Sequence, residues 1–108
     1  MEECIFCSIA NGDPSKLVWH NKVAAAFNDI HPDAPVHALV VPKKHLESMD
    51  QLNDPELAGQ LLLAAREVAH QAGIRGSWRL RVNTGAGAGQ VVNHLHFHVM
   101  GTKTGEAF

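Results

Sequence analysis

The sequence has no excess of positive charge, no long apolar run and only two cysteines. Its 108 residues carry a formal net charge of −2. This charge argues against a general nucleic-acid binder or a protein that binds acidic membranes, because both need a basic surface. The N-terminal stretch is acidic and lacks a long apolar run, so we expect neither a secretory signal nor a membrane span. We therefore expect a cytoplasmic protein that binds neither nucleic acid nor membrane.

The two cysteines, Cys4 and Cys7, form a C-x-x-C pair near the N-terminus. In a chain without a secretion signal, such a pair indicates a metal-binding or redox site rather than a structural disulfide. A thioredoxin-like redox pair belongs in a βαβ unit, and the surrounding sequence lacks that context. Two cysteines alone do not complete a tetrahedral zinc site, so the residues by themselves indicate only a possible metal site.

The chain length and a hydrophobic content of 45% predict one domain, residues 1–108, with a substantial core. The clearest element is a long helix. Asp54 is its expected N-cap, Pro55 fits its first turn, apolar residues follow at helical spacing, and Gly73 is a natural stop. A short helix is expected over residues 3–10.

Short apolar or alternating runs predict the strands, at residues 17–19, 23–27, 37–41, 78–82 and 91–100. Only three residues separate the first two runs, which suggests a hairpin. Mostly sequential strands with one long helix are typical of a small α+β domain with an antiparallel sheet.

Three histidines alternate with apolar residues over residues 94–100, in the run HLHFHVM. Strand side chains point to opposite faces with period two, so the imidazoles are expected in one row, with steps of roughly 6.6 Å. Such a row suits proton transfer, nucleophilic attack or metal binding. The alternative is a strand whose histidines simply face water. The glycine-rich stretch at 85–89 argues against it, because glycines let backbone N–H groups turn toward an anion.

Residues 94–100 match at every position the motif His-φ-His-φ-His-φ-φ, with φ hydrophobic, of histidine triad (HIT) proteins. Three further blocks follow the family order: CIFCSIA at 4–10, AFNDIHPDAPVHALVVPKKH at 26–45 and RVNTGAGAGQ at 81–90. The chain therefore resembles the HIT family over nearly its whole length. Its branch resembles the histidine triad nucleotide-binding (Hint) proteins, which are nucleoside phosphoramidases. The resemblance implies the HIT fold, with a five-stranded antiparallel sheet, one long and one short helix, and a homodimer with a ten-stranded sheet.

The resemblance also implies a mechanism. The enzyme would attack the α-phosphorus of a purine nucleotide of the AMP–amine type and then hydrolyse the nucleotidyl-enzyme. His96 matches the family nucleophile, and a neutral imidazole is competent once a hydrogen bond holds its other nitrogen. His98 is expected to donate to a phosphate oxygen or the leaving group, which contributes roughly 10²–10⁴-fold. His37 matches the family's supporting histidine. No catalytic metal is expected.

The same resemblance assigns nucleotide contacts. Asp29 matches the acidic residue that holds the ribose hydroxyls, and two carboxylate oxygens can accept two vicinal hydroxyls. An ordinary turn aspartate is the alternative. The other positions assigned to the nucleotide are Phe27, Ile30, Leu39, Asn83, Gly89, Gln90, Val91 and Val92. The apolar residues among them could equally be core, and the glycines could serve a tight hairpin.

For the two cysteines, the resemblance supplies the missing ligands. His45 and His94 would complete a Cys4–Cys7 site for Zn²⁺, and the other two triad histidines would stay free for chemistry. The spacing matches no standard zinc finger. The expected zinc is structural: it would tie the N-terminus to the sheet, with no bound water and no part in catalysis.

Three positions depart from the Hint pattern. Val91 stands where many phosphoramidases have a serine, Asn93 replaces an aromatic residue, and Thr102 replaces a second glycine, with a short tail after it. These changes concern leaving-group preference more than the phosphoryl chemistry. The alternatives are a dinucleoside polyphosphate hydrolase, a nucleotide-binding module with negligible catalysis, and a zinc-stabilised interaction domain.

Overall fold

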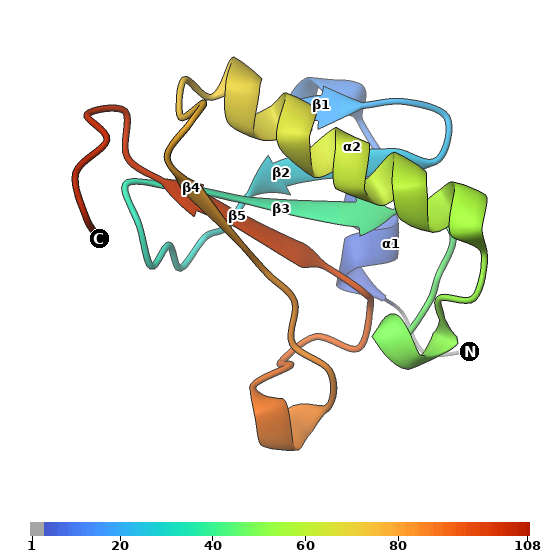
Figure 1. Ribbon diagram of the computed structural model, residues 1–108. Coiled ribbons are helices and arrows are strands. Elements are labelled where there is room, and N and C mark those ends of the chain that lie inside the picture. Colours follow the sequence, from blue (N-terminus) through green and yellow to red (C-terminus); the bar gives the residue numbers. More distant parts are fainter. Residues whose placement is uncertain (1–3) are drawn as a thin grey trace.

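The computed structural model describes residues 4–108, which form an α+β fold with a five-stranded antiparallel sheet (Figure 1). The first residue of the helix expected over 3–10 lies outside the described residues. The strands are β1 (Trp19–His20), β2 (Ala24–Asn28), β3 (Val36–Pro42), β4 (Trp78–Arg81) and β5 (Phe97–Gly101), and the α-helices are α1 (Ile5–Ala10) and α2 (Pro55–Gln71). Short 3₁₀ turns lie at Pro14–Lys16, Met49–Gln51 and Ala86–Ala88.

The strand order is β1-β2-β3-β5-β4, so the last strand lies between β3 and β4. All four pairings are antiparallel. His98 on β5 is paired with Leu39 on β3 and with Arg81 on β4. Directly opposed residues of an antiparallel pair point to the same face, so these three side chains share one face of the sheet.

The two faces carry different clusters. Helix α2 crosses one face, as Figure 1 shows, and Leu61, Ala65 and Val68 pack there against residues such as Val40 and Val99. Helix α1 covers part of the other face, where the buried cluster consists of Phe6, Ala10, Ala25, Phe27, Leu39 and Val41. His98, opposite Leu39, lies on this second face, away from α2.

Helix α2 forms as its local signals predict. The Asp54 carboxylate accepts hydrogen bonds from the backbone N–H groups of Glu56, at 3.0 Å, and Leu57, at 3.3 Å. At the other end, Gly73 has a φ of +81°, a conformation that glycine adopts without strain. The helix buries an apolar stripe against the sheet, which fixes the α2 face as the main core.

The strand expected over residues 91–100 is wrong at its start, because β5 begins only at Phe97. One long-range and one local hydrogen bond hold the preceding segment: the Leu95 N–H donates to the Leu46 carbonyl at 2.7 Å, and the His94 N–H donates to the Val92 carbonyl at 2.9 Å. The three imidazoles therefore do not form an evenly spaced row. The rings of His96 and His98 lie 5.0 Å apart, while His94 joins a separate cluster.

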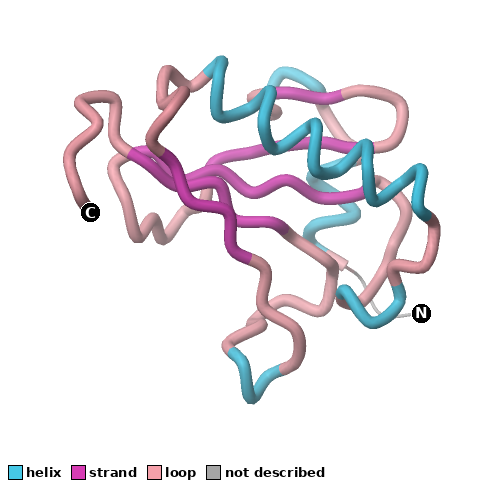
Figure 2. Tube along the Cα trace, viewed as in Figure 1, coloured by secondary structure: helices cyan, strands magenta, loops and turns pink. Residues whose placement is uncertain are grey.

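The segment between β4 and β5 projects from the sheet as a long loop that contains the 3₁₀ turn Ala86–Ala88, as Figure 2 shows. Gly85 and Gly89 flank this turn with φ values of +84° and +93°. In the described part of the chain, no helix has the length and apolarity that a membrane crossing requires.

Candidate active site

A chain of hydrogen bonds fixes the protonation of two buried histidines. The Asp33 backbone N–H can only donate, and it lies 2.9 Å from Nδ1 of His37, which therefore accepts. Nε2 of His37 then carries the proton and donates to Nδ1 of His98, also at 2.9 Å. The proton of His98 is consequently on Nε2. This atom is buried and has no hydrogen-bond partner in the described protein.

The ring of His96 is held in the complementary tautomer. Its Nδ1–H donates to the His94 carbonyl at 2.7 Å, which leaves the lone pair on Nε2. The Phe6 ring packs edge-on against His96, with centroids 5.2 Å apart. A neutral imidazole with one nitrogen held in this way has the arrangement that a nucleophile needs.

Burial favours the neutral form of His37 and of His98. Burial lowers the pKa of His98 to about 4, and the nearby His96 ring and Arg81 guanidinium add to the effect. Burial also lowers the pKa of His37, although the Asp29 carboxylate opposes this shift. Oδ2 of Asp29 lies 3.4 Å from Nε2 of His37. His37 and His98 can therefore take part in this hydrogen-bond network as neutral imidazoles.

The expected nucleoside residues extend from this cluster toward β2. Phe27 and Leu39 are buried, and the Phe6 ring contacts Phe27 edge-on at 5.2 Å. Asp29 follows β2 directly, with Oδ1 accepting from the His31 N–H at 2.9 Å. Ile30 stands in solvent, 86% exposed. The structure thus brings Asp29 beside the histidines, while Ile30 contacts little of the described chain.

The glycine loop connects β4 to the triad segment. The Gln90 amide bonds both inside and outside this loop: Oε1 accepts from the Gly85 N–H at 2.8 Å, and Nε2 donates to the Val92 carbonyl at 3.0 Å and to the distant Glu47 carbonyl at 2.6 Å. Gln90 therefore holds the loop in place through hydrogen bonds to the protein backbone. The amide of Asn83 lies against Gly89.

The two loop valines differ in their surroundings. Val91 is 90% exposed, whereas Val92 is half-buried and packs on the cluster with Phe27 and Leu39. Val92 thus lies near the expected nucleoside residues, and Val91 does not take part in that packing.

A second cluster consists of Cys4, Cys7, His45 and His94, whose donor atoms all lie within 4.8 Å of one another. Nδ1 of His94 lies 3.2 Å from Sγ of Cys4 and 3.2 Å from Nδ1 of His45. Sγ of Cys7 lies 3.3 Å from Nδ1 of His45. A tetrahedron with zinc–ligand bonds of about 2.0–2.3 Å has edges of roughly 3.3–3.8 Å, so the donors fit this ion.

The orientation of the His94 ring also suits a metal. Nε2 of His94 donates to the Pro42 carbonyl at 2.8 Å, which directs the lone pair of Nδ1 toward the cysteines. Burial, reinforced by the Cys4 sulfur, raises the pKa of the Cys7 thiol to about 11. A bound cation would reverse this shift, because a thiol that coordinates a metal ion is deprotonated.

Sequence reasoning missed two charged residues near the histidines. Arg81 shares a face with His98, and its Nη2 lies 3.6 Å from Oδ2 of Asp33. The sequence signal that could have found Arg81 is its position at the start of the block 81–90, which also contains Asn83 and the glycine loop. Asp33 has no comparable signal, because its role depends on how the loop before β3 folds back.

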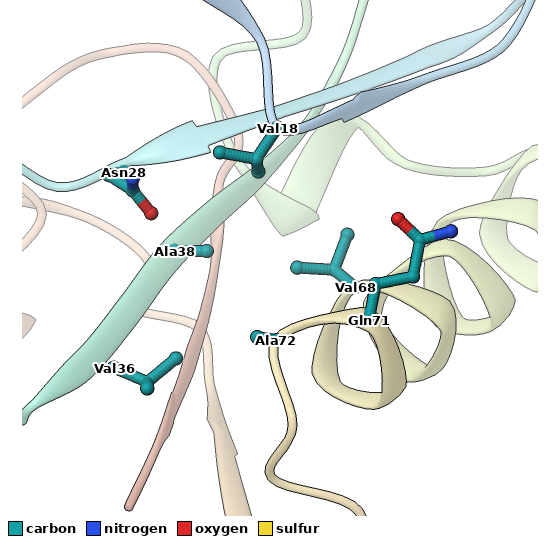
Figure 3. A pocket seen from close by; sticks show the side chains of 7 residues that line it. All are labelled: Val18, Asn28, Val36, Ala38, Val68, Gln71 and Ala72. Carbon is teal, nitrogen blue, oxygen red and sulfur yellow. The ribbon is translucent and has the colours of Figure 1, made fainter. Parts of the chain in front are cut away.

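The opposite face of the sheet has a hollow of about 270 Å³, shown in Figure 3. Val18, Asn28, Val36 and Ala38 line it from the sheet side, and Val68, Gln71 and Ala72 line it from α2. It contains none of the histidines, so it is separate from the candidate active site.

The family profile described as HIT domain matches residues 11–105. The protein HitA of Neisseria gonorrhoeae is 41% identical over 106 residues, which cover 94% of this chain and 98% of HitA. The solved structure of a HIT family hydrolase from Legionella pneumophila superimposes with a TM-score of 0.84 at 40% identity, covering 92% of each chain. A histidine triad nucleotide-binding protein from Candida albicans gives a TM-score of 0.79 at 28% identity, covering 90% of this chain and 73% of its own.

Proposed function

Because the chain belongs to the HIT domain family, we propose that it is a nucleotide hydrolase that acts at the α-phosphate of purine nucleoside phosphoramidates. The observation that carries this proposal is the pair of fixed tautomers. His96 presents an unprotonated Nε2, and His98 presents an Nε2–H without a protein acceptor. A nucleophile and a hydrogen-bond donor therefore stand side by side, with ring centroids 5.0 Å apart.

In the proposed reaction, Nε2 of His96 attacks the α-phosphorus and forms a P–N bond. The bond from phosphorus to the leaving amine breaks, and the amine takes a proton from water. The Nε2–H of His98 donates a hydrogen bond to a phosphoryl oxygen or to the leaving group as charge develops there. Water then hydrolyses the nucleotidyl-histidine, which releases the nucleoside monophosphate and regenerates His96.

The remaining cluster residues position these two groups. His37 orients His98 through the 2.9 Å hydrogen bond, and the Asp33 N–H orients His37. Asp29 lies at the end of the cluster near β2, where its carboxylate can accept the ribose hydroxyls. The base would lie over the apolar side chains of Phe27 and Leu39.

We also propose that Cys4, Cys7, His45 and His94 hold a structural Zn²⁺ ion. The donor spacing and the fixed Nδ1 lone pair of His94 support it. Four protein ligands would close the coordination sphere, so the ion would link α1 to the segments around His45 and His94 without a bound water. The reaction above uses no group of this cluster except the His94 backbone carbonyl.

A homodimer is the third part of the proposal. Strand β4 is an edge of the sheet, and an open edge is a ready site for pairing with a second copy. Leu80 on β4 and Leu62 and Leu63 on α2 are large apolar side chains exposed by 38%, 51% and 63%. Pairing of β4 with its copy would extend the sheet to ten strands and cover apolar surface.

The deciding experiment measures release of AMP and amine from an adenosine 5′-phosphoramidate by wild type and by His96→Ala, with diadenosine polyphosphate in parallel. We expect wild-type turnover that the variant lacks, with the phosphoramidate as the better substrate. Faster cleavage of the polyphosphate would instead favour a dinucleoside polyphosphate hydrolase. Retained AMP binding without turnover of either substrate would refute the enzyme and favour a nucleotide-binding module.

A further inference from the structure

Two buried side-chain atoms in the described part of the chain have no hydrogen-bond partner, and they belong to paired residues. They are Nε2 of His98 and Nε of Arg81. His98 on β5 and Arg81 on β4 are directly opposed in the register, so their side chains point to the same face. Both atoms carry protons, because the hydrogen-bond chain fixes His98 and a guanidinium is always protonated. Leaving two such donors buried is costly unless a ligand supplies the acceptor.

The strand order places this pair of donors along the path of a bound nucleotide. The expected nucleoside residues lie on β2 and β3, the proposed nucleophile and His98 lie at β5, and Arg81 lies on β4, the next strand outward. A nucleotide with its nucleoside toward β2 and its α-phosphate at His96 therefore has its leaving group toward β4. The guanidinium lies in the direction of that leaving group.

We infer that Arg81 is a specificity-determining residue that favours leaving groups carrying a negative charge close to the scissile bond. The inference rests on the proposed function and narrows its substrate class. Arginine binds carboxylates and phosphates through paired N–H donors, so a phosphate chain and an amine that carries a carboxylate both satisfy it. The reaction steps are unchanged: a phosphate leaves as the anion, and a carboxylate-bearing amine takes its proton from water.

The present partner of Arg81 can be displaced. Nη2 lies 3.6 Å from the Asp33 carboxylate, and the two side chains are 40% and 66% exposed. Exposed pairs of this kind are weak, so an incoming anion can compete with Asp33 for the guanidinium. Asp33 orients His37 through its backbone N–H rather than its side chain, so this exchange leaves the histidine chain in place.

The test compares matched substrates and matched variants. The carboxylate substrate is the glycine phosphoramidate of AMP, its methyl ester is the uncharged control, and the phosphate substrate is diadenosine polyphosphate. The variants are Arg81→Gln, Arg79→Gln and Asp33→Asn. Arg79 is the charge control, because it lies on the same strand and face but stacks its guanidinium 4.7 Å from the Phe108 ring centre.

We expect Arg81→Gln to lower kcat/KM for charged leaving groups by about 10-fold and to change the methyl ester by less than about 2-fold. Arg79→Gln should leave the ratio of kcat/KM for the charged substrates to kcat/KM for the methyl ester near the wild-type value. Asp33→Asn should raise kcat/KM for charged leaving groups relative to the methyl ester, because it frees the guanidinium. A loss confined to the polyphosphate identifies a phosphate leaving group, and a loss confined to the glycine compound identifies an acidic amine.

An equal loss of kcat/KM on all substrates in Arg81→Gln would overturn the inference, and so would the same loss in Asp33→Asn. Arg81 would then serve only to hold the loop before β3 through Asp33. Wild-type protein that cleaves none of the substrates would instead overturn the proposed function. In that case, calorimetric titration with AMP and ADP still tests Arg81. Wild type should bind ADP more tightly than AMP, and Arg81→Gln should lose that preference; equal preference in both proteins refutes the role.

Discussion

The triad histidines differ chiefly in what their second ring nitrogen contacts. His94 donates to the Pro42 carbonyl, His96 donates to the His94 carbonyl, and His98 accepts from His37. His94 thereby directs the lone pair of Nδ1 at the cysteines, His96 has a free lone pair on Nε2, and His98 has a free N–H at Nε2. The sequence predicts which residues gather, because the motif is local. It does not predict these tautomers, which depend on partners up to 61 positions away in the chain.

Protonation of His98 should weaken the fold. Its pKa is about 4 in the folded protein, against an ordinary value of 6.5, so the unfolded chain binds more protons between these pH values. Stability attributable to His98 is therefore complete above about pH 6.5 and is lost as the pH falls toward 4, by about 3 kcal/mol at most.

Urea unfolding of wild type and His98→Gln across this pH range measures the effect. The difference in unfolding free energy between the two proteins should shrink as the pH falls. Comparing the two proteins removes the contributions of other titrating groups, which both share. Parallel pH profiles for wild type and variant would show that His98 titrates normally in the folded state.

Among the elements, those with local signals match expectation best. Helix α2 follows the Asp54 cap and the apolar spacing, and its observed range is Pro55–Gln71. The hairpin of β1 and β2 also forms, but β1 is Trp19–His20, shifted from the predicted range 17–19. The predicted start of β5 at residue 91 is wrong because the Leu46 carbonyl, distant in sequence, accepts the hydrogen bond of the Leu95 N–H. Alternation alone carries no information about such a competitor.

The glycine loop should be sensitive at Gly89 and tolerant at Gly87. Gly89 has a φ of +93°, where an L side chain is strained, whereas Gly87 has no positive φ and no atom within 4 Å of an added Cβ. We expect Gly89→Ala to cost about 1–3 kcal/mol of stability and to weaken AMP binding, and Gly87→Ala to do neither. Thermal unfolding and AMP titration of both variants check this. Equal effects of the two substitutions would show that backbone conformation at Gly89 does not set the loop.

Removal of the proposed zinc should destabilise the contact between α1 and the sheet. We expect a chelator to lower the Tm of wild type by roughly 10 °C, because each kcal/mol shifts a domain of this size by about 4–8 °C. Cys7→Ser should start with a reduced Tm and respond little to the chelator. Metal content measured by atomic emission should fall in parallel. A wild-type Tm that ignores both chelator and added zinc would refute a structural ion.

At the scale of the whole molecule, the candidate site draws on every strand pairing from β2 to β4. Asp29 follows β2, His37 lies on β3, His98 on β5 and Arg81 on β4. The sequence contained the first three through a family motif, and the structure confirms the HIT fold that the motif implied. The sequence did not predict a role for Arg81, because that role depends on its pairing with His98 across β4 and β5, which only the folded sheet defines.

The proposed dimer makes a prediction at the same scale. Leu80→Glu places a charge on the exposed edge strand and should halve the molar mass measured by light scattering, because the paired copy would have to bury two carboxylates. Ile5→Glu is the control, since Ile5 is also exposed, at 59%, but lies on α1. Circular dichroism should show both variants folded. A wild type with the mass of one chain would refute the dimer itself.

His94 gives the two clusters a shared peptide. Its side chain points its Nδ1 at the cysteines, and its carbonyl receives the Nδ1–H of His96. A redesign that replaces the cluster of Cys4, Cys7, His45 and His94 with apolar side chains must therefore also keep the carbonyl of residue 94 within hydrogen-bond distance of His96. The N-terminal segment is constrained in the same way, because the contact of Cys4 with His94 indirectly positions the imidazole of His96.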